Sequence, residues 1–313
     1  MSPVGAESVP GGPDPGGWEL ATMRSDGSHR EQITHNHEQE FLPHFSPDGK
    51  RILYTRFTTG GYGVPSSKSR VTVYDLATKK SHDLTTGGAE TYPVWSPDGA
   101  RIAYLRAIDC GPCPAVWLMN ADGSGAHEIV RPSGGNFDRM FGDLAWSRED
   151  WILFVVVELG AHAKCLKTRL DKIRPDGSRR TKVSDGGPNC TPAGMEQSGD
   201  ADPAFSVDGE TIFTSRGFPY PPQGMPGAAV RKIYALSSDA WYPGKPERDL
   251  SLPSEPDCVE GVPKASPDGR RLALFRACGP GEPSGVTLMD TLGSYRNFIA
   301  NGFAPDWNPA WNR

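Results

Sequence analysis

The sequence predicts an all-β fold: a six-bladed β-propeller built from four-stranded antiparallel blades. One segment occurs six times at intervals of roughly fifty residues, which is the length of a four-stranded blade. Each full copy places a tight turn between two short apolar runs. Glycine (37) and proline (30) together make about a fifth of the 313 residues, which is typical of a chain with many turns and short strands.

The first two strands of each predicted blade come from the repeated segment. It is clearest at residues 93–104, PVWSPDGARIAY, and returns at 43–54, 203–214 and 263–274, with a degraded copy at 144–154 and a truncated one at 305–309. Proline begins the first strand, where its missing N–H costs no ladder bond. Ser-Pro-Asp-Gly then makes the turn, because proline fixes φ, aspartate accepts from backbone amides and glycine adopts a positive φ.

The third and fourth strands follow, joined by Asp-Gly turns such as those at residues 122–123 and 176–177. Residues 18–23 and 31–34 are expected to be a third and fourth strand, and residues 306–313 a first strand that extends toward a second. The two chain ends would then complete one composite blade and close the ring. Residues 1–17, rich in glycine and proline, are expected to be a flexible tail, and residues 18–313 a single propeller domain.

The repeats resemble the WD-like repeats of TolB-type β-propellers, whose unit carries an aromatic or apolar residue before Ser-Pro-Asp-Gly. Residues 95–99, WSPDG, match that unit fully, and residues 45–49 and 265–269 match it nearly. The resemblance covers residues 18–313 and does not include the separate N-terminal α/β domain of TolB. It implies a six-bladed toroid that binds something on one face or in its axial channel, in a class that also contains lyases and lactonases.

The charge balance limits the partners. Lys and Arg number 33 against 38 Asp and Glu, for a net charge of -5, so no basic surface for nucleic acid is expected. No apolar run approaches the roughly 20 residues that span a bilayer. We therefore expect a monomer that does not insert into membranes and that binds a protein, peptide or glycan.

Acidic residues recur just ahead of the predicted first strands, where the rim of the central funnel should lie. Four of the six copies carry an acid six residues before the repeated serine or its equivalent, and further acids lie four or two residues before it. The predicted ligand-binding rim is Glu40, Glu90, Asp143, Asp200, Asp202, Glu260 and Asp306. Converging carboxylates raise each other's pKa, which a bound cation or basic ligand would relieve. The alternative is that each acid accepts hydrogen bonds within its own blade.

A candidate metal site lies beside that rim, at His35, His37 and Glu40. His-x-His alternation directs both imidazole rings to one side of an extended chain, and histidine with carboxylate suits Zn, Mn or Fe better than Ca. The cofactor expectation is thus either none or a divalent cation, calcium or a transition metal, in the central channel. The alternative interpretation of the histidines is a polar, solvated loop.

Six cysteines are an even number, which predicts disulfides and an extracellular or periplasmic protein: Cys110, Cys113, Cys165, Cys190, Cys258 and Cys278. Fifteen pairings exist for six cysteines. Cys258 and Cys278 lie at almost equal distance on either side of the turn at 267–268, so they should face each other across a hairpin. Cys110 and Cys113 are near enough to pair in a loop, which would leave Cys165 with Cys190.

Aromatic residues in long insertions of the fourth blade are candidate ligand contacts: Phe218, Tyr220, Trp241 and Tyr242. Exposed aromatics stack on sugar rings or receive a peptide, and the alternative is that the loop packs onto its blade. No catalytic residues are assigned. The predicted function is a secreted or periplasmic binding module that uses the axial funnel and the loop face. The alternative is a metal-dependent lyase or hydrolase that acts on a carbohydrate or lactone at the acidic funnel.

Overall fold

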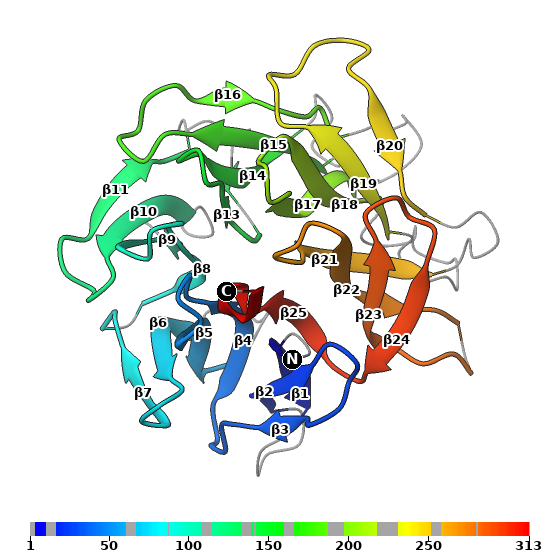
Figure 1. Ribbon diagram of the computed structural model, residues 1–313. Helices are drawn as coiled ribbons and strands as arrows, with labels where there is room; N and C mark the ends of the chain where they lie inside the picture. Colours follow the sequence, from blue (N-terminus) through cyan, green and yellow to red (C-terminus); the bar gives the residue numbers. More distant parts are fainter. Residues whose placement is uncertain are drawn as a thin grey trace.

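Six blades surround a central axis and form a closed β-propeller (Figure 1). The computed structural model describes residues 4–10, 17–60, 67–86, 88–107, 114–132, 139–140, 142–159, 166–186, 197–217, 231–251, 258–279 and 281–312. Within these ranges no helix is long and apolar enough to cross a membrane. The predicted all-β fold with four-stranded antiparallel blades is confirmed.

Two blades follow each other at the start of the ring, and each is an antiparallel meander in chain order. Blade one contains β4 (Gln39–Phe45), β5 (Arg51–Thr59), β6 (Lys68–Asp75) and β7 (Lys80–Asp83). Blade two contains β8 (Glu90–Trp95), β9 (Arg101–Ala107), β10 (Pro114–Asn120) and β11 (His127–Val130).

Blades three and four share one nine-stranded sheet, because β15 and β17 pair in parallel, with Leu166 opposite Gln197. The innermost strand of blade three is interrupted, and its two pieces both pair with β14. Blade three contains β12 (Arg139–Met140), β13 (Ala145–Trp146), β14 (Ile152–Leu159), β15 (Leu166–Ile173) and β16 (Thr181–Lys182). Blade four contains β17 (Gln197–Phe205), β18 (Thr211–Gly217), β19 (Arg231–Ser237) and β20 (Glu247–Asp249).

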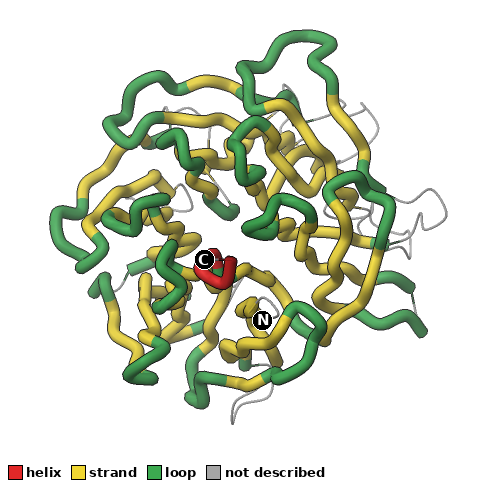
Figure 2. Tube along the Cα trace, viewed as in Figure 1, coloured by secondary structure: helices red, strands yellow, loops and turns green. Residues whose placement is uncertain are grey.

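Blade five is again a simple meander, and the last blade is composite. Blade five contains β21 (Val259–Ala265), β22 (Arg271–Ala277), β23 (Gly285–Asp290) and β24 (Arg296–Ala300). The closing blade combines β25 (Phe303–Trp307) with β1 (Val4–Pro10), β2 (Trp18–Arg24) and β3 (Glu31–Gln32), in the order β25-β1-β2-β3. A short 3₁₀ helix, η1 (Pro309–Asn312), follows β25 at the centre of the ring (Figure 2).

The composite blade corrects one expectation. The flexible tail expected at residues 1–17 is wrong for Val4–Pro10, which form the second strand of the closing blade and pair with both β2 and β25. The C-terminal segment therefore does not supply a second strand. The physical reason is that the polar residues Glu7 and Ser8, one on each face of β1, are both buried, so this strand lacks the apolar alternation by which strands are recognised.

The Ser-Pro-Asp-Gly turns have the hydrogen bonds that their sequence predicts. In blade two, Ser96 Oγ donates to Asp98 Oδ1 over 2.6 Å, and the amides of Ala100 and Arg101 donate to Asp98 and Ser96. Gly99 closes the turn with φ of 70°. Blade three has Asp150 at the glycine position with φ of 64°, and Trp146 Nε1 donates to its carboxylate.

A β-bulge breaks the innermost strand four residues before the repeated serine or its equivalent. The bulge residues have positive φ between 49° and 57° and recur in five blades: Leu42, Tyr92, Asp202, Val262 and Ala304. Four of them, all but Asp202, belong to one buried apolar cluster with Leu144. Because they come from four different blades, these side chains join the blades near the axis.

Candidate functional site

The two ends of the central axis differ, because the innermost strands of all blades run in the same direction along it. They begin at one end, here called the loop end, and finish at the Ser-Pro-Asp-Gly turns, here called the turn end. At the turn end η1 packs over blade one, where a Cβ on Gly49 would lie 2.7 Å from Ala310 Cβ. Residues from all six blades converge along this axis (Figure 1).

Four charged or titratable side chains from different blades meet near the turn end; we call them the axial charge cluster. They are His44, Asp143, Lys264 and Asp306, from blades one, three, five and the closing blade. Lys264 Nζ donates to Asp143 Oδ2 over 2.7 Å, and His44 Nε2 lies 3.5 Å from Asp143 Oδ1. The amide of Phe45 donates to Asp306 Oδ2 over 2.7 Å.

Burial and charge act in opposite directions on the two acids of the cluster. Burial opposes ionisation of Asp143, but Lys264 and His44 outweigh it and hold the pKa of that carboxyl below its usual range. Burial raises the pKa of Asp306, and the same two neighbours only partly offset it. The Lys264–Asp143 ion pair therefore connects blades five and three across the axis, with His44 and Asp306 beside it.

The acids that lie six residues before the repeated serine are buried within their own blades instead. Each faces an arginine directly opposite on the second strand of its blade. The ion pairs are Asp200–Arg216 at 2.6 Å, Glu90–Arg106 at 3.7 Å and Glu260–Arg276 at 3.7 Å. Asp202 likewise accepts from Ser215 Oγ and Arg231 Nη1. The structure thus gives these acids partners within their blades, and ligand binding by them stays a prediction.

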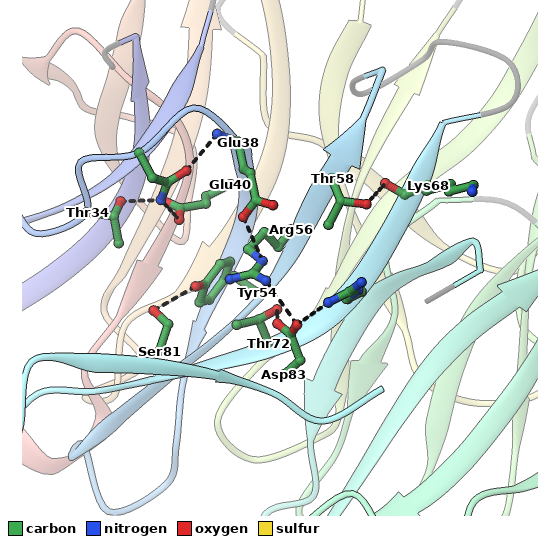
Figure 3. A network of polar contacts seen from close by, with 12 residues as sticks. Thr34, Glu38, Glu40, Tyr54, Arg56, Thr58, Lys68, Thr72, Ser81 and Asp83 are labelled. Atoms are coloured by element: carbon green, nitrogen blue, oxygen red, sulfur yellow. Dashed lines mark hydrogen bonds and ion pairs between the residues drawn. The ribbon is translucent and has the colours of Figure 1, made fainter. Parts of the chain in front are cut away.

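Glu40 departs from that pattern (Figure 3). Its carboxylate accepts hydrogen bonds from Thr34 Oγ1 and Asn36 Nδ2, not from Arg56 opposite. Arg56 pairs with Glu38 at 3.0 Å and with Asp83 at 2.9 Å. Burial raises the pKa of Glu40 to about 8, although these hydrogen bonds lower it and nearby Glu19 raises it further. Glu40 is therefore a buried carboxylic acid at neutral pH.

The three residues of the predicted metal site are not gathered. Glu40 is turned inward and is 1% exposed, whereas His35 and His37 are exposed. His35 Nδ1 lies 3.1 Å from Gln32 Nε2. Across the part of the chain that the structure describes, no three His, Cys, Asp or Glu side chains are placed to hold a metal ion together.

The predicted loop aromatics have different outcomes. Phe218 and Tyr220 lie outside the described residues. Trp241 packs on the outermost strand of blade three, because its amide donates to Lys182 O and Lys182 Nζ lies 4.2 Å from its ring centroid. Tyr242 is 51% exposed and stays available for a contact.

An aromatic cluster at the loop end was missed by the sequence analysis. Phe41 and Phe303 stack with centroids 5.1 Å apart, and Trp18 and Phe275 pack against Phe303 at 6.1 and 4.9 Å. Trp18, Phe275 and Phe303 are half-buried. A signal existed, because Phe41 and Phe303 both lie five residues before the repeated serine or its equivalent. Lys264 was missed too, although it takes a repeat position that is apolar in the second, third and fourth copies.

The predicted disulfide Cys258–Cys278 is confirmed, with the two Cα atoms 4.1 Å apart. It joins the residues that precede β21 and follow β22, at the loop end of blade five and close to Phe275. Cys110, Cys113, Cys165 and Cys190 lie outside the described residues.

Comparisons with known proteins agree with the geometry. No family model matches the chain. The Tol-Pal system protein TolB of Anaeromyxobacter dehalogenans is 30% identical over 115 residues, which are 37% of this chain and 24% of that protein. Dipeptidyl-peptidase 5 of Porphyromonas gingivalis is 39% identical over 64 residues, 20% of this chain and 9% of that protein. The matches thus cover a quarter or less of these relatives.

Solved structures show the same fold at low sequence identity. TolB from Acinetobacter baumannii superimposes with a TM-score of 0.67 and 16% identity, over 98% of this chain and 66% of that one. The oligogalacturonate lyase from Vibrio parahaemolyticus gives 0.55 and 12%, over 87% of this chain and 72% of that one. The β-propeller domain of the Trilobed protease from Pyrococcus furiosus gives 0.53 and 16%, over 96% and 83%.

Proposed function

We propose that this chain, a TolB-like β-propeller, is a periplasmic protein-interaction module that holds an extended segment of a partner at the loop end of its axis. The observation that carries the proposal is the aromatic cluster in which the half-buried Trp18, Phe275 and Phe303 pack around the buried Phe41. Its members come from blades one and five and from the closing blade, so the cluster bridges neighbouring blades.

The cluster has the properties of a binding anchor. Large aromatic side chains dominate binding energy where their positions are fixed in advance. Three of the four stand on innermost or second strands, and Phe275 lies three residues before the disulfide-bonded Cys278. Apolar side chains such as Leu42 and Val262 pack in the same buried cluster as Phe41. A ligand at the loop end would therefore contact the aromatic side chains and would not pass further along the axis.

The axial charge cluster fits a supporting role better than a ligand-binding one. Asp143 and Lys264 are buried and paired with each other, and the half-buried Asp306 accepts from the amide of Phe45, so the cluster offers few free lone pairs or protons to a ligand. Affinity for a partner must then come from the loop end.

The periplasmic location rests on two findings. The disulfide Cys258–Cys278 suits an oxidising compartment. The relatives that match part of this chain are named as TolB proteins of the Tol-Pal system. Because a protein system implies contacts between its members, we expect the partner of this chain to be a protein. A glycan ligand is the competing outcome, because aromatic side chains also stack on sugar rings.

The test is selection of ligands on the purified, unreduced chain. A phage library of random twelve-residue peptides and a glycan array would be probed in parallel. We expect peptides whose affinity falls about tenfold or more in Trp18→Ala and in Phe275→Ala, as for anchor residues. Trp241→Ala removes an aromatic ring that packs on the outside of blade three and should leave the affinity unchanged.

Two outcomes would contradict the proposal. One is a set of selected peptides that bind Trp18→Ala and Phe275→Ala as well as the unchanged chain. The other is binding to the glycan array with no peptide above background. A melting temperature close to that of the unchanged chain, followed by far-ultraviolet circular dichroism, shows for each variant that loss of binding is not loss of folding.

A further inference from the structure

The outermost strands of the blades differ in one respect. An outermost strand has unpaired backbone N–H and C=O groups, and proteins usually keep such strands short and polar to prevent unwanted pairing. Four of the six follow this rule, with two to four residues each: β3 (EQ), β7 (KSHD), β16 (TK) and β20 (ERD). In β11 the apolar residues Ile129 and Val130 pack inward. Only β24 (RNFIA), five residues long, has an exposed aromatic side chain among these six described strands.

Exposed apolar surface is concentrated at this strand. Leu292 is 67% exposed, Tyr295 56% and Phe298 36%. Across the described residues, only Tyr242 is another large apolar side chain in the exposed class. Leu292 and Tyr295 lie in the turn before β24 and Phe298 lies within β24, which is the outermost strand of blade five (Figure 1). We call these three exposed side chains the β24 patch.

The β24 patch is held in a fixed conformation. Asp290 Oδ1 accepts from the amides of Leu292 and Ser294, each over 2.9 Å. Gly293 has φ of 88° and packs against the backbone of Leu250 in blade four. Arg296 donates to Glu260 over 2.8 Å and to Leu250 O over 2.7 Å. These bonds fix both ends of the turn, so the apolar side chains stay exposed on an ordered hairpin.

Positive charge borders the β24 patch, although the whole chain carries -5. Arg248 Nη2 donates to Thr291 O over 2.9 Å, and the amide of Thr291 donates to Arg270 O. Both arginines are exposed, and Arg270 interacts with the carboxylate of Asp268, which accepts from its amide. The carboxylate of Asp290 already accepts turn amides, and Asp249 alternates to the other face of β20, where it interacts with Tyr234. A partner with a carboxylate beside its apolar residues would match this surface.

We propose that β24 is a second docking site, where an extended segment of a partner protein adds as an outer strand. The segment would pair its backbone with the outer edge of β24 ahead of Ile299, whose carbonyl lies against Gly27 of the closing blade. It would place apolar side chains on Phe298 and Tyr295, and an acidic side chain near Arg248 and Arg270. This site lies on the outermost strand of blade five, whereas the aromatic cluster lies on the axis. The inference therefore goes beyond the proposed function and does not depend on it.

The size of the patch favours a peptide segment over a second copy of the chain. A stable protein–protein interface buries roughly 1,600 Å². One five-residue strand and the three exposed apolar side chains in it and in the turn before it offer far less than that. They suit strand addition, in which backbone hydrogen bonds supply much of the affinity.

The test uses the whole unreduced chain and the same random peptide library. Bound phage would be sorted by their loss of binding to Phe298→Lys, which places a charge on the edge of β24. We expect a group of peptides with alternating apolar residues and at least one Asp or Glu, bound about tenfold or more weakly by this variant. His82→Lys puts the same charge on the exposed outermost strand of blade one and should not change their affinity.

Hydrogen exchange supplies a second readout. A bound peptide should slow amide exchange within residues 296–300, and mass spectrometry of peptic fragments would detect it. The proposal is overturned if no peptide is sensitive to Phe298→Lys while the variant keeps its melting temperature. It is also overturned if the unchanged chain sediments as a dimer that Phe298→Lys dissociates, since the occupant is then a second copy. Peptides that lose binding only with Trp18→Ala test the axial site separately.

Discussion

Buried carboxylates near the axis are neutralised by cations in two different ways. Asp200 and Glu260 each face an arginine of the neighbouring strand, so the charge is balanced inside one blade. Asp143 is balanced by Lys264 and His44, which stand on other blades across the axis. The first arrangement follows from the repeat, and the second needs residues that occur once.

The difference separates what builds a blade from what joins the blades. An ion pair within a hairpin connects residues that the hairpin already holds together. The pair across the axis connects two residues that are 121 positions apart in the chain and belong to different blades, so it can resist separation of whole blades. Predictions follow from this contrast, because the two sets should respond differently to loss of their cations.

The largest effect is expected for Lys264→Met. This change leaves the buried carboxylate of Asp143 without its closest cation and removes a positive charge that also acts on Asp306. Removing one partner of a buried pair costs about 3–5 kcal/mol, because the remaining charge stays desolvated. Urea unfolding at pH 7, followed by tryptophan fluorescence, would measure the loss.

The matched control is the double variant Lys264→Met with Asp143→Asn. It removes the orphaned charge, so it should recover much of the stability lost in the single variant. A single variant as stable as the unchanged chain would show that the cross-axis pair does not join the blades.

The second prediction concerns Glu40, the repeated acid without an arginine. Its pKa is raised from 4.5 to about 8 in the folded chain, so the folded state binds a proton that the unfolded state has lost between these values. Stability should therefore fall as the pH rises from about 4.5 to 8. Glu40→Gln keeps a side chain of the same shape that does not ionise, and its stability should fall less steeply.

The expected difference is about 1–3 kcal/mol in favour of Glu40→Gln at pH 8. At pH 5 the unchanged chain and Glu40→Gln should be almost equally stable, because Glu40 is then protonated. The stability of each protein at pH 5 therefore serves as the reference for its stability at pH 8. Thermal unfolding at half-unit pH steps would give both curves. Parallel curves would mean that Glu40 does not titrate in this range. Glu7 should leave a residual slope in both, since burial raises its pKa to about 7.

The sequence repeat determined how much of the fold could be predicted. A turn that recurs in phase fixes the first hairpin of each blade, so the ring, its closure by both chain ends and the Cys258–Cys278 pair all followed from the sequence. Strand β1 did not, because its buried residues include Glu7 and Ser8 and its place is set by pairing with β2 and β25. Pairing partners far apart in the chain leave no local pattern.

The candidate site was predictable only in part for a similar reason. The acids were found because they repeat, but sequence position could not show that Asp200 has an arginine while Glu40 has none. Lys264 occupies a repeat position that is apolar in three copies and holds a histidine and an aspartate in two others, and its partner Asp143 is identified only by the closed ring. Distances across the axis depend on all blades at once.

A third prediction tests the acids balanced within one blade. Arg276→Met should cost only about 1 kcal/mol, because Glu260 keeps its shorter pair with Arg296, at 2.8 Å against 3.7 Å. The same urea experiment would measure it beside Lys264→Met. The comparison fails if Arg276→Met is the more damaging of the two, since within-blade pairs would then carry more of the stability.

The smallest effect is expected at a turn, Asp98→Ala in blade two. Asp98 Oδ1 accepts from Ser96 Oγ at 2.6 Å and from the amide of Ala100 at 3.0 Å, but the site is close to solvent and water can replace these bonds. A loss of about 0.5–1 kcal/mol follows, comparable with the loss of a helix cap. Glu149→Asp in blade three restores the missing turn aspartate and should gain a similar amount. Melting temperatures that move in opposite directions for the two variants would confirm that the turns act locally, and a loss with Asp98→Ala as large as that with Lys264→Met would show that one turn controls closure of the whole ring.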